Sequence, residues 1–308
     1  MAVVSSRLVF LSAICILSAT AIVRPQQYYL NSSCSDKQGI YSSGSTYKAN
    51  LNLVLSPLSS NSTDFDYGFY NSSYGGNPDK VYAIGLCRGD LKPDVCRSCL
   101  SFSKDILPTQ LCPDQKEAIA LYDLCMLRYS SRNIFSTMED TPQFIWYNFL
   151  NFLDYRSKIE FHDQLRSLLQ NLTDRAAAGG SLRKFAVGHA AAPSFETIYG
   201  LVQCTPDLSE QDCKYCLSGA FENFLDDNPW SIGARIVRSS CNFRYEIYSF
   251  YDPTADPPPP GKRIDKFQNL IIIIVVAAAV ALVVQVINIA GICIYLRVRK
   301  PREKPGSK

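Results

Sequence analysis

The spacing of the cysteines constrains the fold of this chain more than any other feature. The pattern C-x8-C-x2-C begins at Cys87 and recurs 117 residues later, beginning at Cys204. The motif CMLRY of the first copy returns as CNFRY in the second. Self-similarity at a fixed offset indicates one structural unit present twice. We therefore expect two tandem domains, at residues 28–135 and 145–251.

The two ends of the chain indicate that these domains are exported. Residues 1–21 contain Arg7, an apolar run and the small residues Ala19-Thr20-Ala21, which is typical of a cleaved secretory signal peptide. Residues 270–296 form an apolar stretch long enough to cross a bilayer as one helix. The larger excess of Lys and Arg follows it, in the short tail 297–308, which predicts a cytosolic C-terminus. We expect a single-pass type I protein of the plasma membrane, with its N-terminus outside the cell.

In an oxidising compartment the cysteines are expected to pair. Of the 12 cysteines, Cys15 lies in the signal peptide and Cys293 in the apolar stretch, which leaves an even number in the exported part. The two C-x-x-C pairs belong to separate repeats and lie amid other cysteines, which argues against a shared zinc ion or a reactive dithiol. We predict structural disulfides, with no metal and no cofactor. The formal net charge of +3 is too small to favour a nucleic-acid partner.

Four sequons support export and predict N-glycosylation. They are at Asn31, Asn61, Asn71 and Asn171.

The hydrophobic pattern predicts an α+β fold in each repeat. Expected helices are Thr46–Ser60, with a distortion at Pro57, a second beginning near Lys92 and reaching Ile106, Tyr155–Ala177 and Leu208–Leu225. Expected strands are Val81–Cys87, Glu117–Tyr122, Cys125–Tyr129, Thr197–Cys204, Arg235–Val237 and Cys241–Tyr248.

Two further segments lie close to the membrane. Residues 252–266 contain four consecutive prolines, which favour an extended spacer. Within the apolar stretch Gln285, Asn288 and Gly291 are three apart and share one helix face. This pattern is typical of helix association, and equally of polar residues that are tolerated near the membrane interface. Cys293 near the cytosolic boundary is a candidate for acylation, although a buried helix cysteine is the commoner case.

The repeats resemble the plant ginkbilobin-type domain, also called the salt-stress/antifungal or cysteine-rich repeat domain. The resemblance covers about residues 28–300 and rests on the paired cysteine motifs and on the phrases YKANLNLVLSPLSS, LCRGDLKPDVCRSCL and SCNFRYEIYSFY. The order of segments is similar to that of cysteine-rich receptor-like kinase ectodomains and of plasmodesmata-located proteins. In both groups a signal peptide is followed by two such domains, a spacer and a membrane helix. The resemblance implies that each repeat is a five-stranded antiparallel sheet packed on two helices.

The resemblance also implies which cysteines pair. The implied disulfides are Cys34–Cys112, Cys87–Cys96, Cys99–Cys125, Cys204–Cys213 and Cys216–Cys241. The second repeat has no counterpart of Cys34–Cys112, because Pro229 and Trp230 stand where one of its cysteines belongs. A disulfide that closes a long loop stabilises a domain strongly, so we expect the second repeat to be the looser one.

The founding member of this family binds mannose through an Asn, an Arg and a Glu. In the first repeat these positions hold Ser35, Ile119 and Ser130, so no sugar site carries over. In the second repeat Arg235 and Glu246 match, without the Asn. The two residues are interpreted either as a remnant of a sugar site or, as we favour, as a cross-strand ion pair.

The sequence contains no Gly-rich loop, VAIK-type lysine, HRD or DFG motif, so we expect no kinase activity and no other enzymatic activity. The preferred hypothesis is a receptor-like cell-surface protein of plant stress or defence signalling. It would recognise an extracellular ligand or a co-receptor, or associate with itself, through its tandem domains. One alternative is a plasmodesmata-located protein that regulates cell-to-cell transport. Another is a tethered carbohydrate-binding or antifungal module.

Overall fold

The computed structural model describes residues 27–59, 68–149, 155–192, 197–228 and 231–255, together with Gln285. The expected signal peptide, Asn61, Pro229, Trp230, most of the spacer, the tail and all of the apolar stretch except Gln285 lie outside the described residues. None of the helices in those described ranges is both long enough and apolar enough to span a bilayer. Both repeats belong to one compact unit that extends to Asp256.

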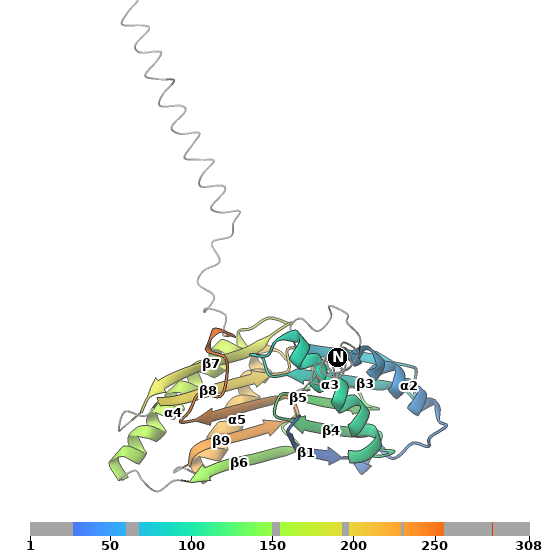
Figure 1. Ribbon diagram of the computed structural model, residues 1–308, viewed down its shortest axis with the longest axis horizontal. Helices are drawn as coiled ribbons and strands as arrows, with labels where there is room; N and C mark the ends of the chain where they lie inside the picture. The colour runs from blue at the N-terminus through green and yellow to red at the C-terminus, as the bar shows by residue number, and fades with distance from the viewer. Residues whose placement is uncertain are drawn as a thin grey trace, which may run out of the picture. The chain divides into compact units, whose positions relative to one another are not determined.

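The first repeat is built on a five-stranded antiparallel sheet in the order β1-β4-β5-β3-β2 (Figure 1). Its strands are β1 (Tyr29–Cys34), β2 (Phe69–Tyr74), β3 (Val81–Cys87), β4 (Glu117–Tyr122) and β5 (Cys125–Ser130). The central strands β4 and β5 are buried along their whole length. Both faces of this sheet are therefore covered.

Two helices cover one face of this sheet. In α2 (Thr46–Leu55), the Ser45 hydroxyl caps the first turn by accepting a hydrogen bond from the Lys48 amide at 3.3 Å. The helix changes to a 3-10 turn (Ser56–Ser59) that contains Pro57, as the sequence predicts. The second helix, α3 (Pro93–Ile106), has its proline in the first turn, where no amide donor is needed. It continues into a π-helical turn (Leu107–Leu111).

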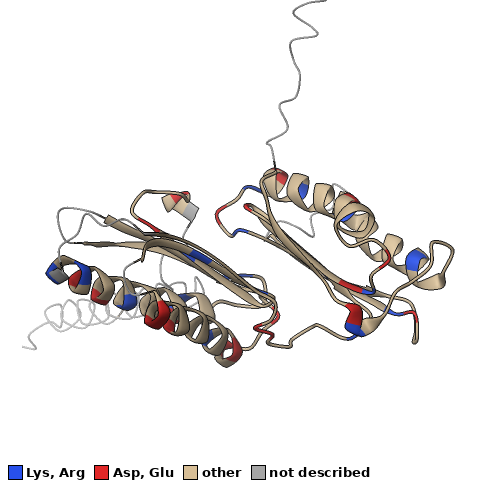
Figure 2. Cartoon of the chain, turned by 90° about the horizontal axis from the view of Figure 1, so that it is seen from below, with Lys and Arg blue, Asp and Glu red and all other residues tan. Residues whose placement is uncertain are grey.

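The second repeat has the same topology, with the strand order β6-β9-β10-β8-β7. Its elements are β6 (Gln143–Phe149), α4 (Tyr155–Ala177), β7 (Lys184–Ala191), β8 (Thr197–Cys204), α5 (Glu210–Asp227), β9 (Ser231–Arg238) and β10 (Cys241–Glu246). Each of the two sheets has its helices on one face (Figure 2). The predicted α+β fold of two five-stranded sheets with two α-helices each is confirmed for the described residues.

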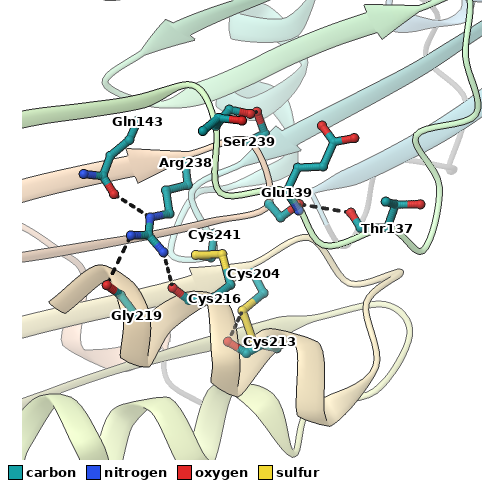
Figure 3. The surroundings of a disulfide bond; sticks show 12 residues. Thr137, Glu139, Gln143, Cys204, Cys213, Cys216, Gly219, Arg238, Ser239 and Cys241 are labelled. Carbon is teal, nitrogen blue, oxygen red and sulfur yellow. Dashed lines mark hydrogen bonds between the residues drawn. A yellow bond between two sulfur atoms is a disulfide. The ribbon is translucent and has the colours of Figure 1, made fainter. Parts of the chain in front are cut away.

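The structure contains five disulfides: Cys34–Cys112, Cys87–Cys96, Cys99–Cys125, Cys204–Cys213 and Cys216–Cys241. These are the pairs that the resemblance implied. In each repeat, one disulfide joins a central strand to the first turn of the helix that follows it. A second joins the same helix to the middle strand of the sheet, which is the last strand of the repeat along the chain, as Cys216–Cys241 does in Figure 3. The cysteine motif thus fixes one helix on its sheet in both repeats.

In the second repeat, polar contacts join the edge strand to the helix at a different place from the extra disulfide of the first repeat. Cys34–Cys112 joins β1 to the segment that follows α3. In the second repeat the Arg238 guanidinium donates to the carbonyls of Cys216 and Gly219 on α5, both at 3.1 Å, and to the Gln143 side chain on β6 at 2.6 Å (Figure 3). Arg238 is buried, so these bonds are protected from water. This arginine therefore links the edge strand to the helix without a covalent bond.

Candidate functional site at the junction of the repeats

The sheet faces that carry no helices meet in a shared apolar cluster. Buried side chains of the first sheet, such as Ile84, Leu121 and Met126, belong to the same cluster as Val237 of β9. Trp146 of β6 packs against it. Burial of apolar surface is the main favourable term in such contacts. The two repeats are therefore held together by a continuous core.

A single carboxylate connects the strands at the edge of this cluster. Asp123, in the turn between β4 and β5, accepts a hydrogen bond from Arg235 of β9 at 2.5 Å. Its carboxylate also lies 3.6 Å from the Arg88 guanidinium and 3.7 Å from that of Arg244. Burial lowers the pKa of Arg235, and the charge of Asp123 opposes that shift. The buried guanidinium of the second repeat thus depends on a carboxylate of the first.

Further hydrogen bonds cross the junction. The Gln203 amide of β8 donates to the Cys87 carbonyl of β3 at 2.9 Å, and both groups are buried. Arg183 donates to the Gly89 carbonyl at 2.9 Å. A side chain at Gly89 would overlap the ring of Phe185, so this close approach requires glycine.

A pocket of about 460 Å³ opens beside Asp123. Its lining residues are Leu30, Asp123, Ile145, Trp146, Tyr147, Asn148, Gly233, Ala234, Arg235, Arg244 and Glu246. Arg244 donates to the Glu246 carboxylate at 2.9 and 3.0 Å, which orients both groups. The pocket combines aromatic surface with paired guanidinium and carboxylate groups, a lining suited to a polar ligand with an apolar face.

Arg235 and Glu246 both line this pocket, but the predicted ion pair between them is wrong. In the register of the sheet Arg235 lies opposite Arg244. Arg244 binds Glu246, which is two residues along the same strand and on the same face, and Arg235 reaches across the junction to Asp123. Asp123 and Arg244 are the residues of this site that sequence reasoning missed. Arg244 was detectable as the repeat counterpart of Arg128.

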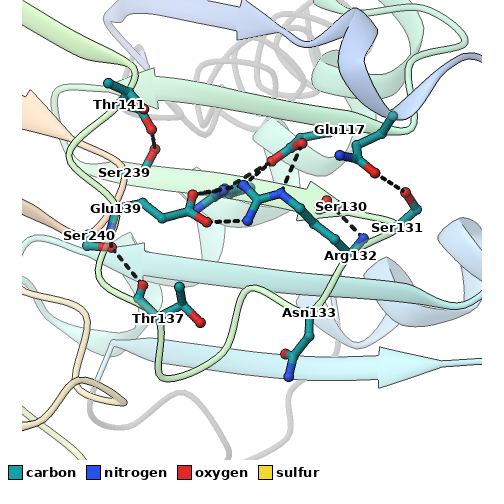
Figure 4. Close-up of polar contacts among 12 residues, drawn as sticks. Glu117, Ser130, Ser131, Arg132, Asn133, Thr137, Glu139, Thr141, Ser239 and Ser240 are labelled. Carbon is teal, nitrogen blue, oxygen red and sulfur yellow. Dashed lines mark hydrogen bonds and ion pairs between the residues drawn. The ribbon is translucent and has the colours of Figure 1, made fainter.

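A second pocket, of about 650 Å³, lies in the first repeat and is lined in part by Ser35 and Ile119. Arg132 donates to Glu117 at 2.6 Å and to Glu139 at 2.9 Å, and the buried Arg128 contacts the same two carboxylates (Figure 4). Burial alone would raise the pKa of Glu139, but the hydrogen bonds and charges of Arg132 and Arg128 hold it below its ordinary value. These four groups satisfy one another and fasten the linker between the repeats.

Three of the four predicted sequon asparagines are described. Asn71 and Asn171 are exposed and Asn31 is partly buried. The proposed association stripe lies outside the described residues apart from Gln285. Within the described ranges, no group of three or more His, Cys, Asp or Glu side chains is placed to hold a metal ion.

The model of the salt stress response/antifungal family matches this chain twice, at residues 33–132 and 151–248. Cysteine-rich receptor-like protein kinase 8 of Arabidopsis thaliana is 39% identical over 257 residues, which cover 82% of this chain and 37% of that protein. Cysteine-rich receptor-like protein kinase 26 is 42% identical over 76% of this chain and 35% of its own length. The chain therefore spans little more than a third of these two relatives.

A shorter relative is matched over most of its length. The putative cysteine-rich receptor-like protein kinase 9 of Arabidopsis thaliana is 42% identical over 232 residues, covering 74% of this chain and 84% of that protein. Among solved structures, the tandem DUF26 ectodomain of the Arabidopsis thaliana cysteine-rich receptor-like protein PDLP5 has a TM-score of 0.57 at 24% identity, covering 72% of this chain and all of that one. The corresponding ectodomain of PDLP8 has a TM-score of 0.58 at 20% identity, over 72% and 98%.

The structural matches show that the tandem fold is shared. The two family matches and the coverage of its relatives show that this chain belongs to the salt stress response/antifungal family and is homologous to the cysteine-rich receptor-like kinases of Arabidopsis.

Proposed function

We propose that this chain is a non-catalytic, receptor-like cell-surface protein of plant stress or defence signalling. Its tandem domains would recognise an extracellular ligand or a co-receptor as one unit. The junction supports this proposal most directly, because the apolar cluster and the Asp123 contacts give the two repeats a fixed common surface. Regulation of cell-to-cell transport at plasmodesmata is the alternative function.

Live imaging of a C-terminal fluorescent fusion of the full chain tests this proposal. We expect a uniform outline at the cell surface, because an apolar stretch long enough to cross a bilayer would hold an exported chain in the membrane. Puncta that cross the cell wall would support the plasmodesmal alternative. Fluorescence confined to the cytosol would contradict both.

The junction pocket favours a second candidate function, saccharide recognition. The aromatic side chains Trp146 and Tyr147 lie in the same pocket as the paired Arg244 and Glu246. A sugar ring presents apolar C–H faces and hydroxyl groups, which match an aromatic surface flanked by fixed hydrogen-bonding groups. This supports a tethered saccharide-binding module in the second repeat. Its carboxylate, Glu246, is one of the two residues that match the family's sugar site.

Glycan-array binding by the exported region tests this second function. Glu246→Gln preserves the shape of the side chain and removes its charge, so binding of a responding saccharide is expected to fall at least about tenfold. Glu160→Gln, on the exposed side of α4, is the matched control and is expected to leave binding unchanged. An array without any binding, or equal binding by both variants, would contradict saccharide recognition at this pocket.

A further inference from the structure

The edge strand β6 differs from the other edges of the two sheets. In the described part of the chain β6 pairs with β9, and no strand lies on its other side. Its sequence QFIWYNF has no charge and no proline. Ile145 and Tyr147 are 41% and 46% exposed. An open, apolar edge with high strand propensity invites pairing with another strand.

The other three edges are polar or covered. The strands β1 and β2 contain Asn31 and Asn71, each in a sequon, and glycans at these positions would block further pairing. On β7, Arg175 donates to the Val187 carbonyl at 3.2 Å, and the Tyr251 hydroxyl donates to the Gly188 carbonyl at 2.7 Å. Proteins commonly protect their sheet edges in such ways. The contrast marks β6 as the edge left available for a partner.

We propose that β6 is a self-association surface, on which a second copy of this chain pairs its own β6 in antiparallel orientation. A two-fold axis perpendicular to the sheet would pass through Trp146 and join two second-repeat sheets into one. Such an interface is isologous, which is the commonest arrangement in homo-oligomers.

The sequence of β6 suits this pairing residue by residue. With Trp146 opposite its own copy, Ile145 lies opposite Tyr147 of the second copy and Phe144 lies opposite Asn148. Aromatic and β-branched residues stabilise each other across antiparallel strands. Because β6 carries no charge, the two copies place no like charges opposite each other.

The position of β6 in the fold favours a second copy over an unrelated partner. Phe144 and Trp146 pack against the junction cluster, so the strand is held in a fixed conformation before it pairs. An interface between two β6 strands would extend the junction cluster to the second copy. An unrelated acidic or basic segment would find no complementary charge on the strand. Ile145 to Asn148 also line the junction pocket, so self-pairing would bring the pockets of two copies to one interface.

Register-specific disulfide trapping in the full chain tests this proposal. Two differently tagged chains, one with Ile145→Cys and the other with Tyr147→Cys, are expressed together with Cys293→Ser in both. Opposed residues in an antiparallel pair have Cα atoms about 4.5–5.5 Å apart, which is within disulfide range. Two copies of Ile145→Cys would instead be about 8.5 Å apart, because two residues along a strand span about 6.8 Å. We expect mild oxidation to link the mixed pair at least about tenfold more than either variant with itself.

A control and a disrupting variant complete the experiment. Tyr215→Cys, at a position 67% exposed on α5, is expected not to link two copies. Adding Ile145→Lys to the chain that carries Tyr147→Cys places a charge on the edge and is expected to abolish its link to the Ile145→Cys chain. Equal linkage of all variants, or no linkage of the mixed pair, would overturn the proposal. Energy transfer between full chains that is unaffected by Ile145→Lys but lost in Gln285→Leu would also overturn it, because association would then lie in the apolar stretch.

Discussion

Replacement of Asp123 by alanine is expected to lower the free energy of unfolding of the exported region, residues 27–255, by about 3 kcal/mol. The substitution removes the carboxylate that Arg235 binds at 2.5 Å and leaves a largely buried guanidinium without that partner. Removing one member of a buried pair costs roughly 3–5 kcal/mol, and the 28% exposure of the Asp123 side chain places it at the lower end. Arg88 and Arg244 are less affected, because they keep Asp90 and Glu246.

Urea unfolding of the wild type and the variant measures this effect. Asp105→Ala is the matched control, because the Asp105 side chain is 66% exposed and pairs with the neighbouring Lys104. A surface pair of this kind contributes at most about 1 kcal/mol, and often nothing measurable. A loss of stability in Asp123→Ala no larger than that of the control would show that the Asp123 contacts do not hold the junction.

Removal of Cys34–Cys112 is expected to have the largest effect of any disulfide, about 4 kcal/mol. In the chain-entropy model the stabilisation grows with the length of the closed loop, and this disulfide joins residues 78 apart. Cys87–Cys96 joins residues 9 apart, and its removal is expected to cost roughly 2.5 kcal/mol. The double alanine variants of each pair, unfolded in urea under non-reducing conditions, provide the comparison.

The ranking of these two variants tests the physical account of the disulfides. A larger loss from the short-loop pair would show that local packing of the buried cysteines outweighs loop closure.

The second repeat offers a further comparison, since Arg238 joins its edge strand to α5 without a covalent bond. Arg238→Met keeps much of the side-chain volume but removes these hydrogen bonds, and we expect it to destabilise the second repeat by about 2–3 kcal/mol.

The central elements of the fold were predictable from the sequence, whereas the edges were not. Val81–Cys87, Glu117–Tyr122 and Thr197–Cys204 were predicted with the bounds that the structure shows, because each is an apolar run between turn signals. The four edge strands β1, β2, β6 and β7 were not located. The edge strands β1 and β2 of the first repeat tolerate polar residues, as YLNSSC in β1 illustrates, so their hydrophobic pattern is weak. The strands β6 and β7 are more apolar, and sequence reasoning overlooked them.

The candidate site was only partly predictable for a different reason. The family resemblance located Arg235 and Glu246 in the pocket, but their partners depend on strand register and on the contact between repeats. Asp123 occupies a turn, where an aspartate is common and gives no signal of a distant partner. Its role arises because the two sheets meet. The interpretation of Arg235 as a partner of Glu246 was wrong because Arg244 lies closer to that carboxylate.

We infer that the two repeats act as one unit through their junction. Scanning calorimetry of the exported region tests it most directly, because a single cooperative unit unfolds in one transition with equal calorimetric and van't Hoff enthalpies. We predict one such transition for the wild type. Two separate transitions in the wild type, each with the enthalpy of a single repeat, would contradict the claim.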